Sequence, residues 1–172
     1  EINMKLPEIP SLFHIRPYQE SDRERIIEIS REAFENHIDR FSKDPYIQKN
    51  KGLEYNIEWT KNCCNGTEAD VMLVAEKNGK VVGFICHKLN KILNGLSDKI
   101  RYGGHGLSAA SKEGRGAYVS LVAALIRHSV ETLTTVDYDT QINNFSVIRI
   151  WNKLGLSYVR SKYTFHRWLG AE

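Results

Sequence analysis

The stretch Ser108–Leu125, "SAASKEGRGAYVSLVAAL", joins two different kinds of sequence. Its first part holds small residues, charges and the run Gly114, Arg115 and Gly116. Its second part has the apolar spacing of an amphipathic helix that is expected to begin at about Ala117. A helix start offers N–H groups without intrahelical acceptors and the positive end of the helix dipole, so this glycine turn suits a bound anion. A plain tight turn uses the same residues, so the choice depends on the rest of the chain.

The flanking sequence predicts a mixed α/β fold. Two apolar runs, Val71–Ala75 and Val81–Cys86, flank Asn78-Gly79, which is a strong hairpin signal. A strand is expected at 13–18, followed by a helix with Ser21 and Glu24 as its capping box. Further expected elements are a helix at 53–63, a strand within 101–110, the helix from 117, a strand at 135–141, a helix at 146–155 closed by Gly155, and a terminal strand pair at 157–169. This order predicts a single mixed, mostly antiparallel sheet flanked by helices.

Composition narrows the class of protein. The 172 residues suit one domain, predicted at 13–172 after an extended lead-in at 1–12. The net charge of +3 gives no argument for nucleic acid, and no apolar run is long enough to span a membrane. No signal-peptide pattern is seen, and the three cysteines show neither a disulfide framework nor metal-ligand spacing. We therefore expect a cytoplasmic protein without a metal site.

Two motifs together resemble the GNAT superfamily of acetyl-CoA-dependent N-acetyltransferases. The first is the turn Glu113–Tyr118, followed by an apolar pair in the helix. The second lies downstream and consists of Asn144, Val147, Ile150, Trp151, Gly155 and Leu156. The chain departs from the family pattern at three positions. Glu113 replaces an arginine or glutamine, Tyr118 replaces the last glycine, and Trp151 replaces the tyrosine that in many members protonates the departing thiolate.

The resemblance implies direct transfer of an acetyl group from acetyl-CoA to an amine. The turn would hold the pyrophosphate through its backbone N–H groups, and the strand before it would pair with pantetheine and present an N–H to the thioester oxygen. Asn144 would bond to the coenzyme near its sulfur, and Trp151 would be a helix core residue or a wall of the coenzyme site. The implied cofactor-binding residues are Ser108, Ala109, Ala110, Gly114, Arg115, Gly116, Ala117, Tyr118, Asn144 and Trp151.

The residue that acts as general acid is not identified by the resemblance, because the indole N–H of Trp151 cannot donate a proton in catalysis. Tyr158 is the first candidate, since a tyrosine has both the proton and the reach. His166 is the second and His105, in "GGHG", is the third. Both histidines equally suit structural or solvated positions.

The acceptor amine is suggested by a narrower resemblance. "DRFSKDPYI" (39–47), "EYNIEWTKN" (54–62) and "YTFHRW" (163–168) are similar to dTDP-amino-sugar N-acetyltransferases. This resemblance implies a small-molecule acceptor of the nucleotide-linked amino-sugar class, contacted by Gln141 and by Trp59 as a stacking platform. Two alternatives stay open, namely a protein or peptide N-acetyltransferase and a non-catalytic acyl-CoA-binding module. The expected protein is a monomer or homodimer that binds neither nucleic acid nor membrane.

Overall fold

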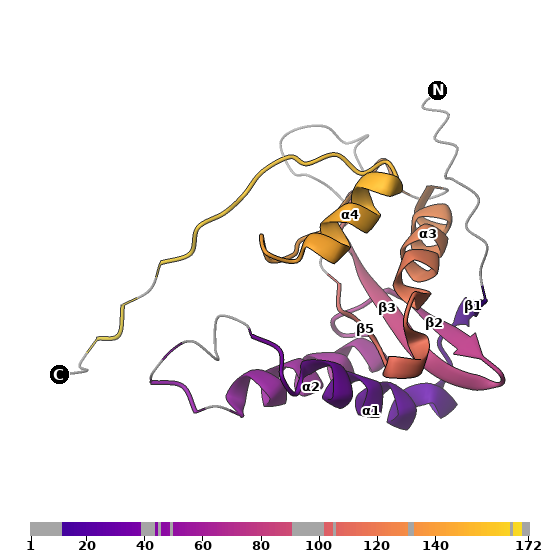
Figure 1. Cartoon of the computed structure of the whole chain (residues 1–172), viewed down its shortest axis with the longest axis horizontal. Helices are drawn as coiled ribbons and strands as arrows, with labels where there is room; N and C mark the ends of the chain where they lie inside the picture. The colour runs from indigo at the N-terminus through magenta and orange to yellow at the C-terminus, as the bar shows by residue number, and fades with distance from the viewer. Residues whose placement is uncertain are drawn as a thin grey trace. The chain divides into compact units, whose positions relative to one another are not determined.

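The computed structural model describes residues 12–38, 44, 46–48, 50–90, 102–104, 106–130, 133–165 and 167–169 (Figure 1). The chain divides into two compact units, a larger one of Glu8–Asp139 and a smaller one of Glu1–Pro7 with Thr140–Glu172. In chain order, the larger unit contains β1 (His14–Pro17), the 3-10 helix η1 (Glu20–Asp22), α1 (Arg23–Phe34), α2 (Lys51–Cys64), β2 (Val71–Lys77), β3 (Lys80–Asn90), β4 (Tyr102–Gly104), β5 (Ser108–Ala110), the 3-10 helix η2 (Lys112–Gly114), α3 (Ala117–Val130) and β6 (Thr135–Asp137). The smaller unit contains α4 (Phe145–Lys153).

A six-stranded mixed sheet is the centre of the larger unit. Its strand order is β1-β2-β3-β4-β6, and β5 also pairs with β3. All pairings are antiparallel except that of β4 with β6, which is parallel. The predicted fold class, a mixed and mostly antiparallel sheet with flanking helices, is therefore confirmed.

The β2–β3 hairpin forms where the sequence predicts it. Asn78 and Gly79 have φ values of 52° and 74°. Two successive positive φ values define the type I′ turn, whose twist matches that of the flanking strands. The long β3 is the strand on which the other parts of the sheet are assembled, because β2, β4 and β5 all pair with it.

Helices cover both faces of this sheet. Ile26 and Ile29 of α1 pack with Cys63 of α2 against alternate residues of β2 and β3, among them Val74 and Phe84. Figure 1 shows α3 on the opposite side of the sheet from α1 and α2. It buries an apolar stripe made of Ala117, Leu121, Val122, Ala123, Leu125 and Ile126. The helix predicted from about Ala117 is thus confirmed, and it begins directly after the glycine turn.

In the smaller unit, Gly155 closes α4 as predicted, two residues after the last helical residue, Lys153. This glycine has a φ of 83°, its N–H donates to the Asn152 carbonyl at 3.1 Å, and the Leu156 N–H donates to the Trp151 carbonyl at 3.0 Å. These two bonds form a Schellman motif, in which a glycine adopts the left-handed conformation that closes the helix.

Two local predictions are wrong. The capping box forms around η1, between Gln19 and Asp22, and does not involve Ser21 and Glu24. In the predicted terminal strand pair, the described residues 157–165 and 167–169 form neither strand nor helix. Alternation of apolar residues predicts a strand, but a strand also needs a neighbour to satisfy its backbone groups.

None of the helices in the described part of the chain is long and apolar enough to cross a membrane.

Candidate functional site

The glycine turn between β5 and α3 is held tightly against β3. The Ser111 N–H donates to the Val82 carbonyl at 2.9 Å, and the Gly114 N–H donates to the Ser111 carbonyl at 3.0 Å. A Cβ atom at Gly114 would overlap the Val82 carbonyl oxygen and would lie 3.0 Å from the carbonyl carbon. Gly114 is therefore required because the backbone of the turn passes directly over β3.

Gly116 serves a different purpose in the same turn. Its φ is 92°, and an added Cβ would meet no atom within 4 Å. This conformation lets the chain enter α3 directly, and no other atoms pack beside Gly116. The helix supplies no acceptors for the N–H groups of its first turn, which begins at Ala117, and its dipole is positive there. The arrangement is suited to an anion.

The charged residues of the turn face solvent. Glu113 and Arg115 are both exposed, and the described part of the chain gives Glu113 no ion pair. Tyr118, in the first turn of α3, is half-buried. The carboxylate of Glu113 is thus free to point away from a ligand in the turn.

Strand β5 leads directly into this turn. Ser108, Ala109 and Ala110 are half-buried and pair with Ile85, Phe84 and Gly83 of β3. Among the described strands β5 has no second neighbour, because β6 pairs with β4 instead. In the described sheet, one edge of β5 is therefore unpaired, as the addition of an extended ligand would require.

In the smaller unit, Asn144 stands at the N-terminal cap position of α4. Its Nδ2 donates to Thr140 Oγ1 at 2.9 Å, and its Oδ1 accepts from Ser146 Oγ at 3.2 Å. The side chain makes no hydrogen bond to a backbone N–H of the helix. Gln141 is exposed, and its carbonyl accepts the Asn144 N–H at 2.9 Å. Trp151, on α4, is half-buried.

The remaining predicted site residues that the structure describes are Tyr158, in the smaller unit, and Trp59, in the larger one. The Tyr158 hydroxyl lies 2.8 Å from Ser161 Oγ, and the residue is 77% exposed. Trp59 on α2 is half-buried, packs against the core and has its ring centroid 6.1 Å from that of Tyr55. His105 and His166 lie outside the described residues.

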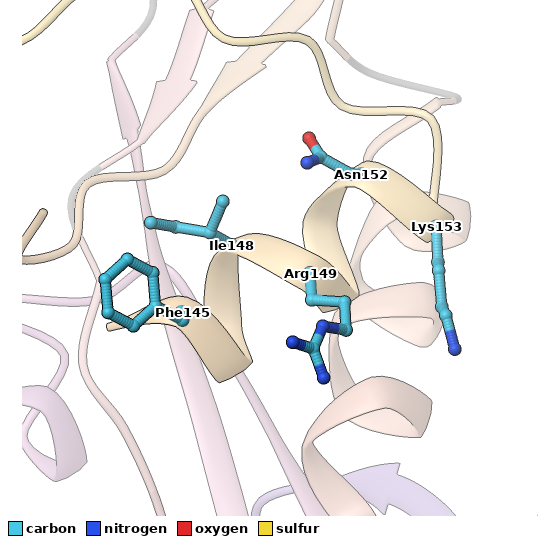
Figure 2. A pocket seen from close by; sticks show the side chains of 5 residues that line it. All are labelled: Phe145, Ile148, Arg149, Asn152 and Lys153. Atoms are coloured by element: carbon cyan, nitrogen blue, oxygen red, sulfur yellow. The ribbon is translucent and has the colours of Figure 1, made fainter. Parts of the chain in front are cut away.

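Sequence reasoning missed two features. An open pocket lies along α4, lined by Phe145, Ile148, Arg149, Asn152 and Lys153 (Figure 2). The spacing i, i+4 of Arg149 and Lys153 was the available signal, since it places two cations on one face of a helix. The second feature is the buried imidazole of His87, which stacks on Tyr138 with ring centroids 5.7 Å apart. The sequence around His87, which follows an apolar run, does not indicate that its ring stacks on a distant tyrosine.

Across the described residues, no group of three or more His, Cys, Asp or Glu side chains is placed to hold a metal ion. The three cysteines, Cys63, Cys64 and Cys86, are buried and free.

Comparison with known sequences gives one clear relative. No model of a known protein family matches the sequence. The spore coat polysaccharide biosynthesis protein SpsD of Bacillus subtilis (strain 168) is 30% identical over 168 residues, which cover 95% of this chain and 53% of SpsD. The chain thus spans about half the length of the curated relative that it matches.

Solved structures define the class of fold. The aminoglycoside acetyltransferase AAC(6')-Iy, solved with the bisubstrate analogue CoA-S-monomethyl-acetylneamine, has a TM-score of 0.61 and 16% identity, covering 92% of this chain and 100% of its own. Glucosamine-6-phosphate N-acetyltransferase from Arabidopsis thaliana has a TM-score of 0.58 and 17% identity. The match covers 90% of this chain and 97% of that enzyme's chain. The chain therefore has the fold of these N-acetyltransferases. This is the GNAT fold that the sequence resemblance implies.

Proposed function

We propose that the chain transfers an acetyl group from acetyl-CoA directly to a primary amine of a small molecule. The observation that carries the proposal is the turn Ser111–Ala117. It combines a glycine pressed onto β3, a glycine with positive φ, and the start of α3 beside the open edge of β5. The fold is shared with acetyltransferases, but a fold hosts many functions, so the site supplies the argument.

In this proposal the pyrophosphate of acetyl-CoA binds the backbone N–H groups of Gly114–Tyr118, which α3's dipole makes more attractive to an anion. The pantetheine arm lies along Ser108–Ala110 as an added strand, and an N–H of this strand polarises the thioester carbonyl. Arg115 adds a positive charge at the turn. Asn144 contacts the coenzyme near its sulfur, and Trp151 forms part of the coenzyme wall.

The chemistry is attack by a neutral amine on the thioester carbon, followed by departure of the coenzyme thiolate. Tyr158 is our first choice to protonate that thiolate, with His166 and His105 next. The exposure of Tyr158 leaves its hydroxyl accessible to a ligand or to solvent. Gln141 and the exposed part of Trp59 contact the acceptor.

We further propose that the acceptor is an amino sugar, in particular a nucleotide-linked one. SpsD is named for spore coat polysaccharide biosynthesis, and one protein of the same fold acetylates glucosamine-6-phosphate. Arg149 and Lys153, beside the apolar side chains of the α4 pocket, suit a diphosphate and a base (Figure 2). The protein would act in the cytoplasm, which its three free thiols favour, as a monomer or homodimer.

The test is release of CoA thiol from acetyl-CoA, measured with four sets of amines. These are nucleotide-linked amino sugars, free amino sugars, amino acids, and peptides with basic residues. We expect turnover with nucleotide-linked amino sugars at a kcat/KM at least about tenfold above that for the others, a difference worth roughly 1.4 kcal/mol in the transition state. Preference for peptides would overturn the amino-sugar proposal. Acetyl-CoA binding without turnover on any amine would favour a non-catalytic acyl-CoA-binding module.

Asn144 gives a second prediction. Because its amide caps no helix N–H, Asn144→Ala should cost less than about 1 kcal/mol of unfolding free energy. It should lower kcat/KM about tenfold or more, through loss of a coenzyme hydrogen bond. Urea unfolding and initial rates measure the two effects. Asn143→Ala, at the exposed neighbouring position, is the matched control and should leave both unchanged. A loss of stability with normal kinetics would assign Asn144 to the turn alone.

A further inference from the structure

The sheet of the larger unit forks at one point. Strand β3 pairs with β5 up to Ile85 and Ser108, and with β4 from Lys88 and Gly104. Two β3 residues, Cys86 and His87, thus face the interruption between β4 and β5, where the Cys86 N–H donates to the Leu107 carbonyl at 2.9 Å. Between these two pairings the opposite strand segment has one residue more than β3, and a mismatch of this kind is a bulge, which is common beside active sites.

The fork is also where β6 stops pairing. Its last pair is Asp137 with Gly104 of β4, and β5 has no pairing with β6. Tyr138 follows β6 directly at this point and stacks on the His87 ring, with an interplanar angle of 16°. The two aromatic rings therefore lie where the edge of β5, proposed above to bind the pantetheine arm, becomes open.

His87 occupies an unusual environment for an imidazole. Its relative exposure is 1%, and within the described part of the chain neither ring nitrogen has a hydrogen-bond partner. The ring is accommodated because residue 103 is glycine. A Cβ there would lie 2.8 Å from His87 Cε1 and would also overlap Leu133. Burying an imidazole with two unpaired nitrogens lowers the stability of the fold. A histidine kept at such a position therefore calls for a functional explanation.

Burial favours the neutral form of His87 and outweighs its polar and charged neighbours. Burial lowers the pKa of His87, while the nearby Gly103 backbone and the Asp70 carboxylate raise it less. Tyr138 faces the ring from the end of β6, and its own pKa is raised by burial and by Tyr118 on α3. The Gly103 backbone lies near the ring without forming a hydrogen bond of good geometry. At neutral pH, His87 is thus a neutral imidazole, which can accept a proton at one ring nitrogen and carries an N–H at the other.

We propose that His87 is the group that takes the proton from the acceptor amine, through one water molecule at the fork, while Tyr138 holds its ring in place. This inference rests on the proposed acetyl transfer. The amine nitrogen forms its bond to the thioester carbon, and the C–S bond breaks with its electron pair on sulfur. The proton lost by nitrogen passes to the imidazole and then to solvent, and the thiolate takes a proton from its own donor or from solvent.

The experiment compares His87→Gln with His128→Gln in the whole chain, using acetyl-CoA and the best amine from the thiol-release assay. His128 is an exposed histidine on α3 and serves as the matched control. We expect His87→Gln to bind acetyl-CoA normally, to lose about 100-fold in kcat/KM at pH 7, and to lose the acidic limb of the pH profile. His128→Gln should match the unmodified protein in all three.

Two results would overturn the inference. One is a folded His87→Gln protein with an unmodified pH profile, and the other is equal loss of acetyl-CoA binding and rate, which would mean a structural role. If His87→Gln does not fold, NMR titration of the His87 ring in the unmodified protein decides, because its pKa must coincide with the acidic limb of kcat/KM. An unmodified protein without turnover on any amine would instead refute the proposed function.

Discussion

Replacement of Gly114 by alanine should destabilise the protein by about 3 kcal/mol, which for a chain of this size lowers Tm by about 6 to 12 °C. The cost is steric. The new Cβ would overlap the Val82 carbonyl oxygen, and that carbonyl is fixed because it accepts the Ser111 N–H. Gly114 does not have a positive φ, so alanine meets no backbone strain there and the clash alone is measured. Thermal and urea unfolding provide the numbers.

Gly116→Asn is the matched control for this variant. It removes a glycine from the same turn, but the position has open space, and asparagine tolerates a positive φ better than most residues. We expect a cost of about 1 kcal/mol. Should Gly114→Ala prove as stable as Gly116→Asn, the turn does not pack on β3 as described.

The parts of the fold that follow from local sequence were predictable. Asn78-Gly79 specifies a type I′ turn almost alone, because both residues accept positive φ. The apolar stripe of α3 defines its length and its buried face in the same way. The closing of α4 by Gly155 depends on residues within one turn of the helix.

Features that depend on distant residues were not predictable from the same patterns. Gly103 and Gly106 belong to the run "GGHG", in which no local pattern shows why glycine is needed. A Cβ at Gly106 would overlap the Cys86 carbonyl, and one at Gly103 would press on the His87 ring. Both contacts come from β3 pairing across the fork. Likewise, alternation after Gly155 describes a strand's side chains but not the neighbour that it needs. Ser108–Ala110, predicted to end a strand before the turn, do form β5, whereas the buried His87–Tyr138 pair has no local signature.

Asp22→Asn should have the second large effect, about 2 to 3 kcal/mol of unfolding free energy at pH 7. Arg16 holds Asp22 through two bonds, Nη1–Oδ2 at 2.7 Å and Nη2–Oδ1 at 2.9 Å, and the carboxylate side chain is only 8% exposed. Removing one partner of a buried pair leaves the other charge uncompensated, which typically costs 3–5 kcal/mol. The expected loss is smaller because Arg16 keeps its bond to Glu76 at 2.9 Å.

The pH dependence identifies the cause. Hydrogen bonding to Arg16 lowers the pKa of Asp22 in the folded protein, against the opposing effect of burial. Its stabilisation is therefore complete above the unfolded value of about 3.9 and is lost as the pH falls through the lower folded pKa. The difference between the unmodified protein and Asp22→Asn should thus shrink below about pH 4. Glu28→Gln, which breaks the exposed pair with Arg25, should cost less than about 0.5 kcal/mol. A difference for Asp22→Asn that stayed constant down to pH 2.5 would mean that the ion pair is not what holds η1 against β1.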